Sequence, residues 1–313
     1  MATVPAKQNE FASTLAANLH SKSNVSRDAP SDEWTLIIRP FDSLLNLRLE
    51  EIWRYRDLLS LFVRRDFVAF YKQTILGPLW YILQPMMMTI VFTLVFNKIA
   101  GIGTDGIPPV LFYLAGITCW AYFSECLTKT SDTFVANQHL FGKVYFPRII
   151  VPLSITVSGL IKFAIQFGVF AIVMAYLVGT GDCSLELNAY ALLLPLLILI
   201  MAMLAMAFGL IISALTSKYR DLKFALTFGI QLWMYATPIV YPMSIIGGGK
   251  WKYLIRANPM SHVVETFKFG FLGEGMFSWW HLGYATSFSM LLLYFAIMVF
   301  NRVERTFMDS VCS

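Results

Sequence analysis

The sequence predicts an all-α membrane protein with six transmembrane helices, an N-terminal amphipathic interface helix and short re-entrant helices between spans five and six. Three observations predict this class. Of the 313 residues, 57% are hydrophobic and 14% are charged, whereas about 25% of the residues in a soluble domain are charged. Six apolar runs approach the roughly 20 residues that cross a bilayer core of about 30 Å. The cations lie beside these runs, which favours lipid headgroups over nucleic acid as their partners.

The N-terminal region precedes every apolar run. Residues 1–33 are rich in Ser, Ala, Asn, Lys and Asp, and their few apolar residues do not form the hydrophobic region of a signal peptide. We expect a disordered cytoplasmic tail here. Residues 34–78 are expected to form a cytoplasmic segment that contains the amphipathic helix, and residues 79–313 the six-span domain.

The amphipathic helix is predicted over residues 52–73. On a helical wheel its apolar side chains fall on one face, and Arg64, Arg65 and Lys72 fall on the other. Such a helix lies along the membrane surface, and a plain topology anchor would show the same pattern. Asp66, however, falls within the apolar face. This carboxylate favours a helix that packs against protein, where it can find a partner.

The spans follow in order along the chain. They are Leu79–Asn97, Ile107–Cys126, Ile149–Val178, Tyr190–Leu215, Phe224–Val240 and Leu282–Phe300. Pro85 is expected to kink the first span, because proline removes a helical hydrogen bond. The long apolar segment 241–281 is broken by Gly247-Gly248-Gly249 and by Asn258-Pro259. It predicts short re-entrant helices, since irregular backbone at membrane depth needs cover from protein or a water-filled cavity.

Short loops indicate the orientation, because Lys and Arg concentrate on the cytoplasmic side. Cations precede span one and follow spans two, four and six, whereas the outer loop over residues 179–188 has none. Both termini are therefore expected in the cytoplasm.

Two charged residues lie within predicted spans, Glu125 in the second and Lys162 in the third. An unpaired charge there costs at least about 2.5–3.5 kcal/mol. Both residues are expected at a similar depth on the cytoplasmic side, so we predict a buried Glu125–Lys162 ion pair. The alternative is that Lys162 faces a wet cavity. A proton relay is disfavoured because no further chain of carboxylates or histidines follows.

The cytoplasmic loop over residues 129–153 alternates aromatic and polar residues. This pattern predicts a short helix that docks into another protein, although a simple connection between two spans would also fit. The chain has no phosphate-binding G-x-x-x-x-G-K-[ST] motif and no H-E-x-x-H or G-x-S-x-G motif. It is therefore not expected to hydrolyse ATP, to bind a metal or to be an enzyme.

Five stretches together carry a family resemblance: RRDFVAFYKQTILGPLWYILQP, NQHLFGKVYFPRIIVP, YRDLKF, TPIVYP and NPMSHVVETFKFGFLG. In this order they resemble the membrane permeases of ABC-type polysaccharide exporters, which move O-antigen, capsule or teichoic acid chains. The resemblance covers about residues 36–309. It implies a homodimer in the bacterial inner membrane, with a pore between the protomers for an undecaprenyl-pyrophosphate-linked polysaccharide, O-antigen above all. It also implies two copies of a separate ATPase, which would bind ATP and Mg, and no cofactor in this chain.

The resemblance assigns roles to particular residues. The helix at 52–73 would be a gate at the cytoplasmic mouth, where Arg64, Arg65 and Lys72, with Asp66 beside them, would meet the lipid pyrophosphate or only ordinary headgroups. Residues of the 129–147 loop would couple to the ATPase: Asn137, His139, Leu140, Phe141 and Lys143. Aromatic residues of spans one, two and five would line the pore: Trp80, Tyr81, Phe92, Tyr113, Trp120, Tyr122, Phe123, Trp233 and Tyr235.

Two other functions fit the same composition. One is a permease of similar build that exports a small molecule or a lipid. The other is a membrane-embedded transferase or an uncoupled channel. A neighbouring ATPase gene among glycosyltransferase genes would favour the polysaccharide exporter.

Overall fold

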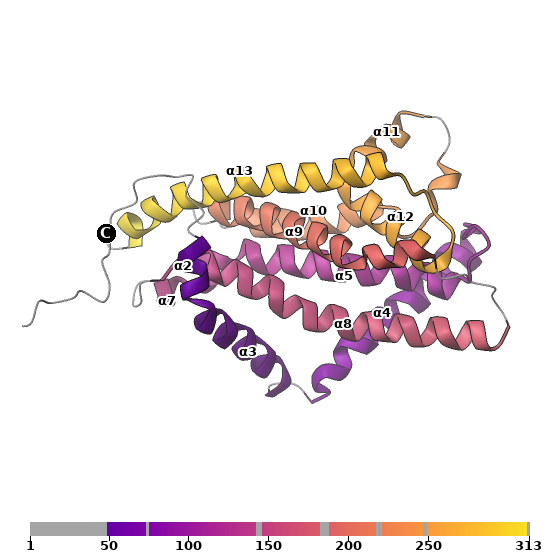
Figure 1. Ribbon diagram of the computed structural model, residues 1–313, viewed down its shortest axis with the longest axis horizontal. Helices are drawn as coiled ribbons and strands as arrows, with labels where there is room; N and C mark the ends of the chain where they lie inside the picture. The colour runs from indigo at the N-terminus through magenta and orange to yellow at the C-terminus, as the bar shows by residue number, and fades with distance from the viewer. Residues whose placement is uncertain are drawn as a thin grey trace, which may run out of the picture. The chain divides into compact units, whose positions relative to one another are not determined.

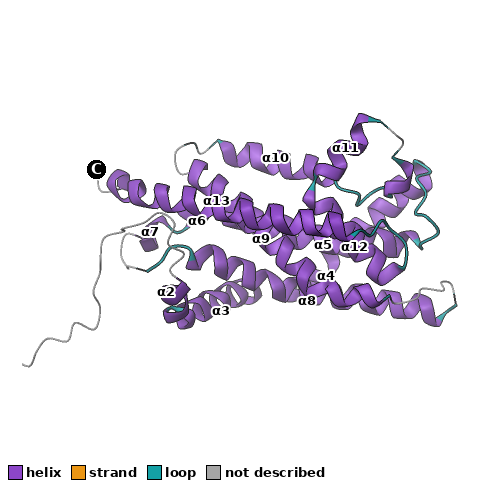
Figure 2. Ribbon diagram, turned by 45° about the horizontal axis from the view of Figure 1, so that its top comes forward, coloured by secondary structure: helices purple, strands orange, loops and turns teal. Residues whose placement is uncertain are grey.

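The computed structural model describes residues 49–72, 75–141, 146–181, 188–216, 219, 221–246 and 249–311. These residues form helices and connecting turns, and no strand occurs among them (Figures 1 and 2). The predicted tail at residues 1–33 lies outside the described residues.

Five helical segments in the described ranges are long and apolar enough to cross a membrane. They are Gly77–Ile99, Pro109–Ser131, Ile150–Gly179, Ala189–Thr216 and Trp279–Val303. The first joins η1 (Gly77–Leu79), α4 (Trp80–Phe92) and the π-helix η2 (Thr93–Ile99). The others are α5 (Pro109–Ser131), α8 (Ile150–Gly179), η3 (Ala189–Leu193) with α9 (Leu194–Thr216), and α13 (Trp279–Val311). These segments correspond to predicted spans one to four and six.

The predicted fifth span is a shorter helix, α10 (Leu222–Tyr235), of 14 residues. At about 1.5 Å per residue it is about 21 Å long, which is less than the thickness of a bilayer core. The helix ends before Pro238, because proline has no N–H to donate and disfavours helical backbone in the residue before it. The turn that follows, residues 237–240, is buried in the protein.

The segment between α10 and α13 contains η4 (Met243–Ile245), α11 (Lys250–Ala257) and α12 (Pro259–Leu272). α12 is buried at every residue except Phe269, which is half-buried. Asn258 caps its N-terminus, since the Asn258 Oδ1 accepts from the Met260 N–H at 3.1 Å. Gly273 ends the helix in the left-handed conformation, with φ of 76°.

The amphipathic segment forms α2 (Leu49–Arg54) and α3 (Arg56–Lys72). α3 packs along α8 (Figure 2), and its Phe62 is 5% exposed. Two short helices, α6 (Thr133–Ala136) and α7 (Gln138–Phe141), follow α5. Figure 1 shows α2, α7 and the C-terminal end of α13 at one end of the helices and α11 at the other. Because Phe62 is buried and α3 lies along α8, α3 is a helix that packs against protein.

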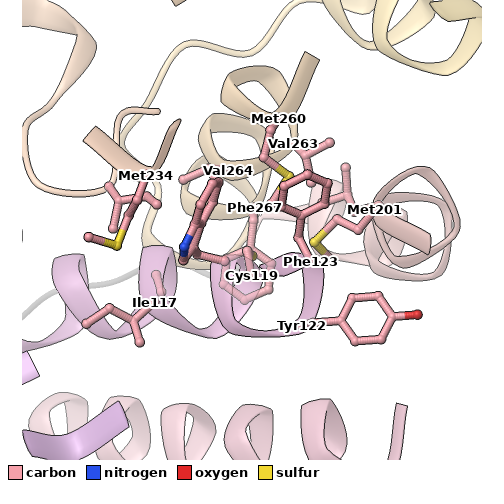
Figure 3. Close-up of a cluster of buried hydrophobic side chains, with 14 of the residues drawn as sticks. Ile117, Cys119, Tyr122, Phe123, Met201, Met234, Met260, Val263, Val264 and Phe267 are labelled. Atoms are coloured by element: carbon pink, nitrogen blue, oxygen red, sulfur yellow. The ribbon is translucent and has the colours of Figure 1, made fainter. Parts of the chain in front are cut away.

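α5 lies at the centre of the main hydrophobic core. Figure 3 shows Cys119 and Phe123 of α5 beside Met201 of α9 and beside Val264 and Phe267 of α12. Cys119, Phe123 and Met201 are fully enclosed. α12 is thus part of the same core as the transmembrane helices, although it is too short to span a membrane itself.

Gly209 of α9 sits where α9 packs closely against α5. A Cβ atom at this position would lie 2.5 Å from the Thr130 Cβ and 3.2 Å from the Leu127 backbone oxygen. Small residues permit such close helix packing in membranes. Replacing Gly209 with alanine is expected to lower the free energy of unfolding by about 1–3 kcal/mol, because overpacking shifts the backbone. Thermal unfolding in detergent measures this change.

Gly168 provides the control for that substitution. It lies in α8, and a Cβ there would meet nothing within 4 Å. Replacing Gly168 with alanine is expected to leave the unfolding temperature unchanged or to raise it slightly. Equal effects at both positions would contradict the role of close packing.

Candidate functional site

A first cavity of about 580 Å³ lies between α3, α4, α5, α6 and α8. We call it the mouth cavity. Its charged lining side chains are Arg65, Asp66, Glu125, Lys129, Asp132 and Lys162. These groups come from α3, α5, α8 and, for Asp132, the junction of α5 and α6. The amphipathic helix α3 therefore forms one wall of a charged cavity.

A second cavity of about 540 Å³, the central chamber, is formed by α4, α5, α8 and α10. Trp120 is its aromatic lining residue, and its polar lining side chains beyond the ionic ones are Gln84, Ser124, Thr128, Gln166, Thr227 and Gln231. The chamber therefore offers an aromatic ring, apolar surface and neutral hydrogen-bonding groups.

Three charged residues, Glu125, Lys129 and Lys162, line both cavities. The Glu125 Oε2 lies 2.5 Å from the Lys162 Nζ, and the Glu125 Oε1 lies 2.8 Å from the Lys129 Nζ. One carboxylate is thus held between two ammonium groups. The Lys162 Nζ also lies 5.3 Å from the centroid of the Tyr81 ring. The structure brings the sequence-predicted pair together at the boundary between the two cavities.

The predicted gate residues separate into two groups. The Arg65 guanidinium lies 2.9 Å from the Asp66 carboxylate, and both line the mouth cavity. The same guanidinium lies 4.8 Å from the centroid of the Phe62 ring. Arg64 and Lys72 are exposed and are not among the residues that line this cavity. Of the three cations predicted for the gate, Arg65 is therefore the one that lines the mouth cavity.

The predicted pore aromatics are dispersed. Trp120 lines the central chamber and Tyr81 lines the mouth cavity. Trp80 and Tyr235 are exposed, while the half-buried Trp233 donates its indole N–H to Asn258 at 3.1 Å. The remaining aromatics pack in the core: Phe92, Tyr113, Tyr122 and Phe123. The central chamber is lined by Trp120 together with amide and hydroxyl side chains, which the sequence pattern did not single out.

The predicted coupling residues lie in and beside α6 and α7. His139 is exposed and Leu140 is half-buried. Asn137 lines the mouth cavity and donates to the Thr133 carbonyl at 3.0 Å. Phe141 is 4% exposed and packs inside the protein. Lys143 lies outside the described residues.

A chain of aromatic rings connects this segment to the rest of the fold. The successive ring centroids of Phe62, Phe146, Phe141, Phe134 and Phe300 lie 5.8, 5.8, 6.1 and 4.7 Å apart. The chain therefore runs from α3 through α7 and α6 to α13.

Lys268 of α12 is a buried cation in the segment 241–281, and the sequence analysis gave it no role. Its Nζ donates to the Pro238 carbonyl at 2.6 Å and lies 3.4 Å from the centroid of the Phe112 ring. Burial lowers the pKa of Lys268 to about 8, and the nearby Glu265 carboxylate opposes that shift. Lys268 ties α12 to the turn that ends α10. The charge alone gave no signal of burial.

Most of the chain is similar in sequence to known proteins. The family model described as ABC-2 type transporter matches residues 57–272. The O-antigen export system permease protein RfbA of Myxococcus xanthus is 27% identical over 265 residues, which are 84% of this chain and 98% of that protein. RfbA of Klebsiella pneumoniae is 23% identical over 81% of this chain and 94% of its own length.

A further relative is named for a different polysaccharide. The polysialic acid transport protein KpsM of Escherichia coli is 25% identical over 80% of this chain and 95% of its own length. The family match covers more than half of the sequence and includes the interface helix α3, both cavities and α12. The chain therefore belongs to the ABC-2 type transporter family of membrane proteins.

Proposed function

We propose that this chain is the membrane permease of an ATP-driven exporter that moves a lipid-linked polysaccharide, O-antigen above all, across the bacterial inner membrane. The central chamber is the observation that carries the proposal. An aromatic ring such as Trp120 can stack on the C–H face of a sugar, and amides such as Gln84 and Gln231 can exchange hydrogen bonds with hydroxyls. Contacts of this kind are weak and repeated, as a conducted substrate requires. The relatives are named for O-antigen export and for polysialic acid transport, which agrees with a polysaccharide cargo.

The proposal includes a homodimer with the pore between its protomers. α4 and α10, which border the chamber, carry large exposed apolar side chains: Trp80, Met87, Met88, Phe224, Phe228 and Leu232. A second copy placed against these helices would close the chamber off from lipid. In this arrangement α10 is the fifth of six spans, and both termini lie in the cytoplasm.

The proposal also assigns ATP hydrolysis to a separate partner. Two copies of this ATPase would bind ATP and Mg, while this chain transports without catalysing a reaction. Val135, Gln138 and His139 of α6 and α7 are exposed. α7 lies at the same end of the helices as α2 (Figure 1). These short helices are the proposed docking element, since they are positioned by the aromatic chain yet present polar and apolar side chains outward.

Deletion of the gene in its native host tests the function. The expected result is that lipid-linked glycan accumulates on the cytoplasmic side and is lost from the surface, and that a plasmid copy restores export. Intact surface glycan after deletion would reject the proposal. Loss of a drug or lipid efflux activity, with surface glycan intact, would instead support the small-molecule permease.

The pyrophosphate of an undecaprenyl carrier is the proposed ligand of the mouth cavity, with Arg65 as its main contact. Replacing Arg65 with glutamine is expected to lower export by about tenfold or more, because a charge-assisted hydrogen bond to phosphate is lost. Surface glycan measured per permease molecule in the membrane gives the export rate.

Arg64 supplies a matched control, since it is adjacent, equally cationic and not part of the cavity lining. Replacing it with glutamine removes the same positive-inside charge but is expected to preserve export. Equal losses in both variants, or failed membrane insertion of both, would show that these arginines act only on topology.

A further inference from the structure

Three polar residues form a stripe along α8, a helix that is otherwise mostly apolar. Ser158, Lys162 and Gln166 follow one another at four-residue spacing, so their side chains lie on one face of the helix. At about 1.5 Å per residue the stripe extends over about 12 Å.

The stripe runs from one cavity to the other. Ser158 lines the mouth cavity, and Gln166 lines the central chamber. Lys162 lies between them and lines both. The polar side chains of α8 thus extend from the mouth cavity, past the Glu125–Lys162 ion pair, into the central chamber.

Two members of the stripe have a buried polar atom without a partner. The Gln166 Oε1 and the Ser158 Oγ make no hydrogen bond to any residue that the structure describes, and Gln166 is only 1% exposed. The hydroxyls of Thr118, Thr128 and Thr156 donate to carbonyls of their own helices. Two further hydroxyls of α5, those of Tyr113 and Thr130, are also buried without a partner among the described residues, but these residues line neither cavity. Buried polar groups are nearly always paired in proteins. The unpaired atoms therefore point to a ligand that supplies the missing partner.

The chemistry of the stripe defines this ligand. The amide of Gln166 carries one hydrogen-bond acceptor and two donor hydrogens, and rotation about the last side-chain bond can turn the oxygen or the nitrogen toward the chamber. The hydroxyl of Ser158 both donates and accepts. Such groups suit a chain of neutral hydroxyls, which also donate and accept at each position. The other walls of the chamber add the aromatic ring of Trp120 and the amides of Gln84 and Gln231.

We propose that Ser158, Lys162 and Gln166 form a hydroxyl-binding track that the sugar chain follows from the mouth cavity into the central chamber. This inference rests on the proposed function and names the residues that would contact the cargo. The track provides hydrogen bonds on both sides of the Glu125–Lys162 pair, so that a passing hydroxyl finds a new partner before it leaves the last one.

The test uses a deletion strain that carries the permease gene on a plasmid. Gln166→Met and Ser158→Ala are each expected to lower the rate of surface glycan appearance by about fivefold, the effect of one lost hydrogen bond. Since neither atom has a partner in the fold, the purified variants should melt at the wild-type temperature or above it. A structural role would instead lower the melting temperature.

Thr156→Val is the matched control, because Thr156 is a buried hydroxyl of the same helix that bonds to the Pro152 carbonyl at 2.9 Å and lines neither cavity. It is expected to export at the wild-type rate. Wild-type rates in both Gln166→Met and Ser158→Ala would overturn the track while leaving the proposed function intact. If the wild-type gene itself fails to restore surface glycan, the proposed function fails.

Discussion

Replacing Glu125 with glutamine is expected to lower the free energy of unfolding by about 3 kcal/mol and to abolish export. Glu125 neutralises Lys162 and Lys129, whose Nζ atoms lie 2.5 and 2.8 Å from its two carboxylate oxygens. Removing one partner of a buried pair costs about 3–5 kcal/mol, because the other charge is left without compensation. The Glu125 and Lys162 side chains are 24% and 15% exposed, so the lower part of that range applies. Unfolding of the detergent-purified variant measures the effect.

A double variant separates charge from packing. In Glu125→Gln combined with Lys162→Met, the stranded ammonium is gone, and most of the lost stability is expected to return. Asp57→Asn serves as the control for removal of a carboxylate, since the Asp57 side chain is 96% exposed and 3.9 Å from Arg56. Its effect is expected to stay below about 0.5 kcal/mol. Equal losses in the single and double variants would contradict a charge effect.

The same ion pair shows what could be predicted from the sequence. A charge within an apolar run is rare and costly, so Glu125 and Lys162 were conspicuous, and similar depth was enough to pair them. Long apolar runs likewise predicted the five long helices. The fifth apolar run, Phe224–Val240, is the shortest of the six and contains the Thr237-Pro238 step, and α10 ends just before that step, at Tyr235.

The lining of the chamber could not be predicted in the same way. Aromatic residues serve equally well in a core and in a pore wall, and only tertiary packing decides between these places. Phe123 and Trp120 are three residues apart in α5 and both are buried in the core, yet of the two only Trp120 reaches the wall of the chamber. Gln84, Gln166 and Gln231 come from three helices that are distant in sequence, so no spacing pattern links them. The burial of α12 arises from the same kind of long-range packing.

Replacing Phe134 with alanine is expected to lower the free energy of unfolding by about 3–4 kcal/mol, as truncation of a buried phenylalanine leaves a cavity. Phe134 is fully enclosed, and its ring stacks on Phe300 with centroids 4.7 Å apart. It anchors α6 to α13 and forms part of the aromatic chain that reaches α3. The substitution is therefore also expected to reduce the coupling between ATP hydrolysis and export, because the proposed docking element loses its attachment to the transmembrane helices.

Coupling is measured as glycan exported per ATP hydrolysed, in membranes that contain the permease and its partner ATPase. Val135 provides the control, since it is the next residue in α6 and is 41% exposed. Replacing Val135 with alanine is expected to leave stability nearly unchanged, because little buried surface is lost. Replacing Phe134 with leucine is expected to cost less stability than replacing it with alanine, because leucine leaves a smaller cavity. If Phe134→Ala leaves both the stability and the coupling unchanged, the aromatic chain contributes to neither of them.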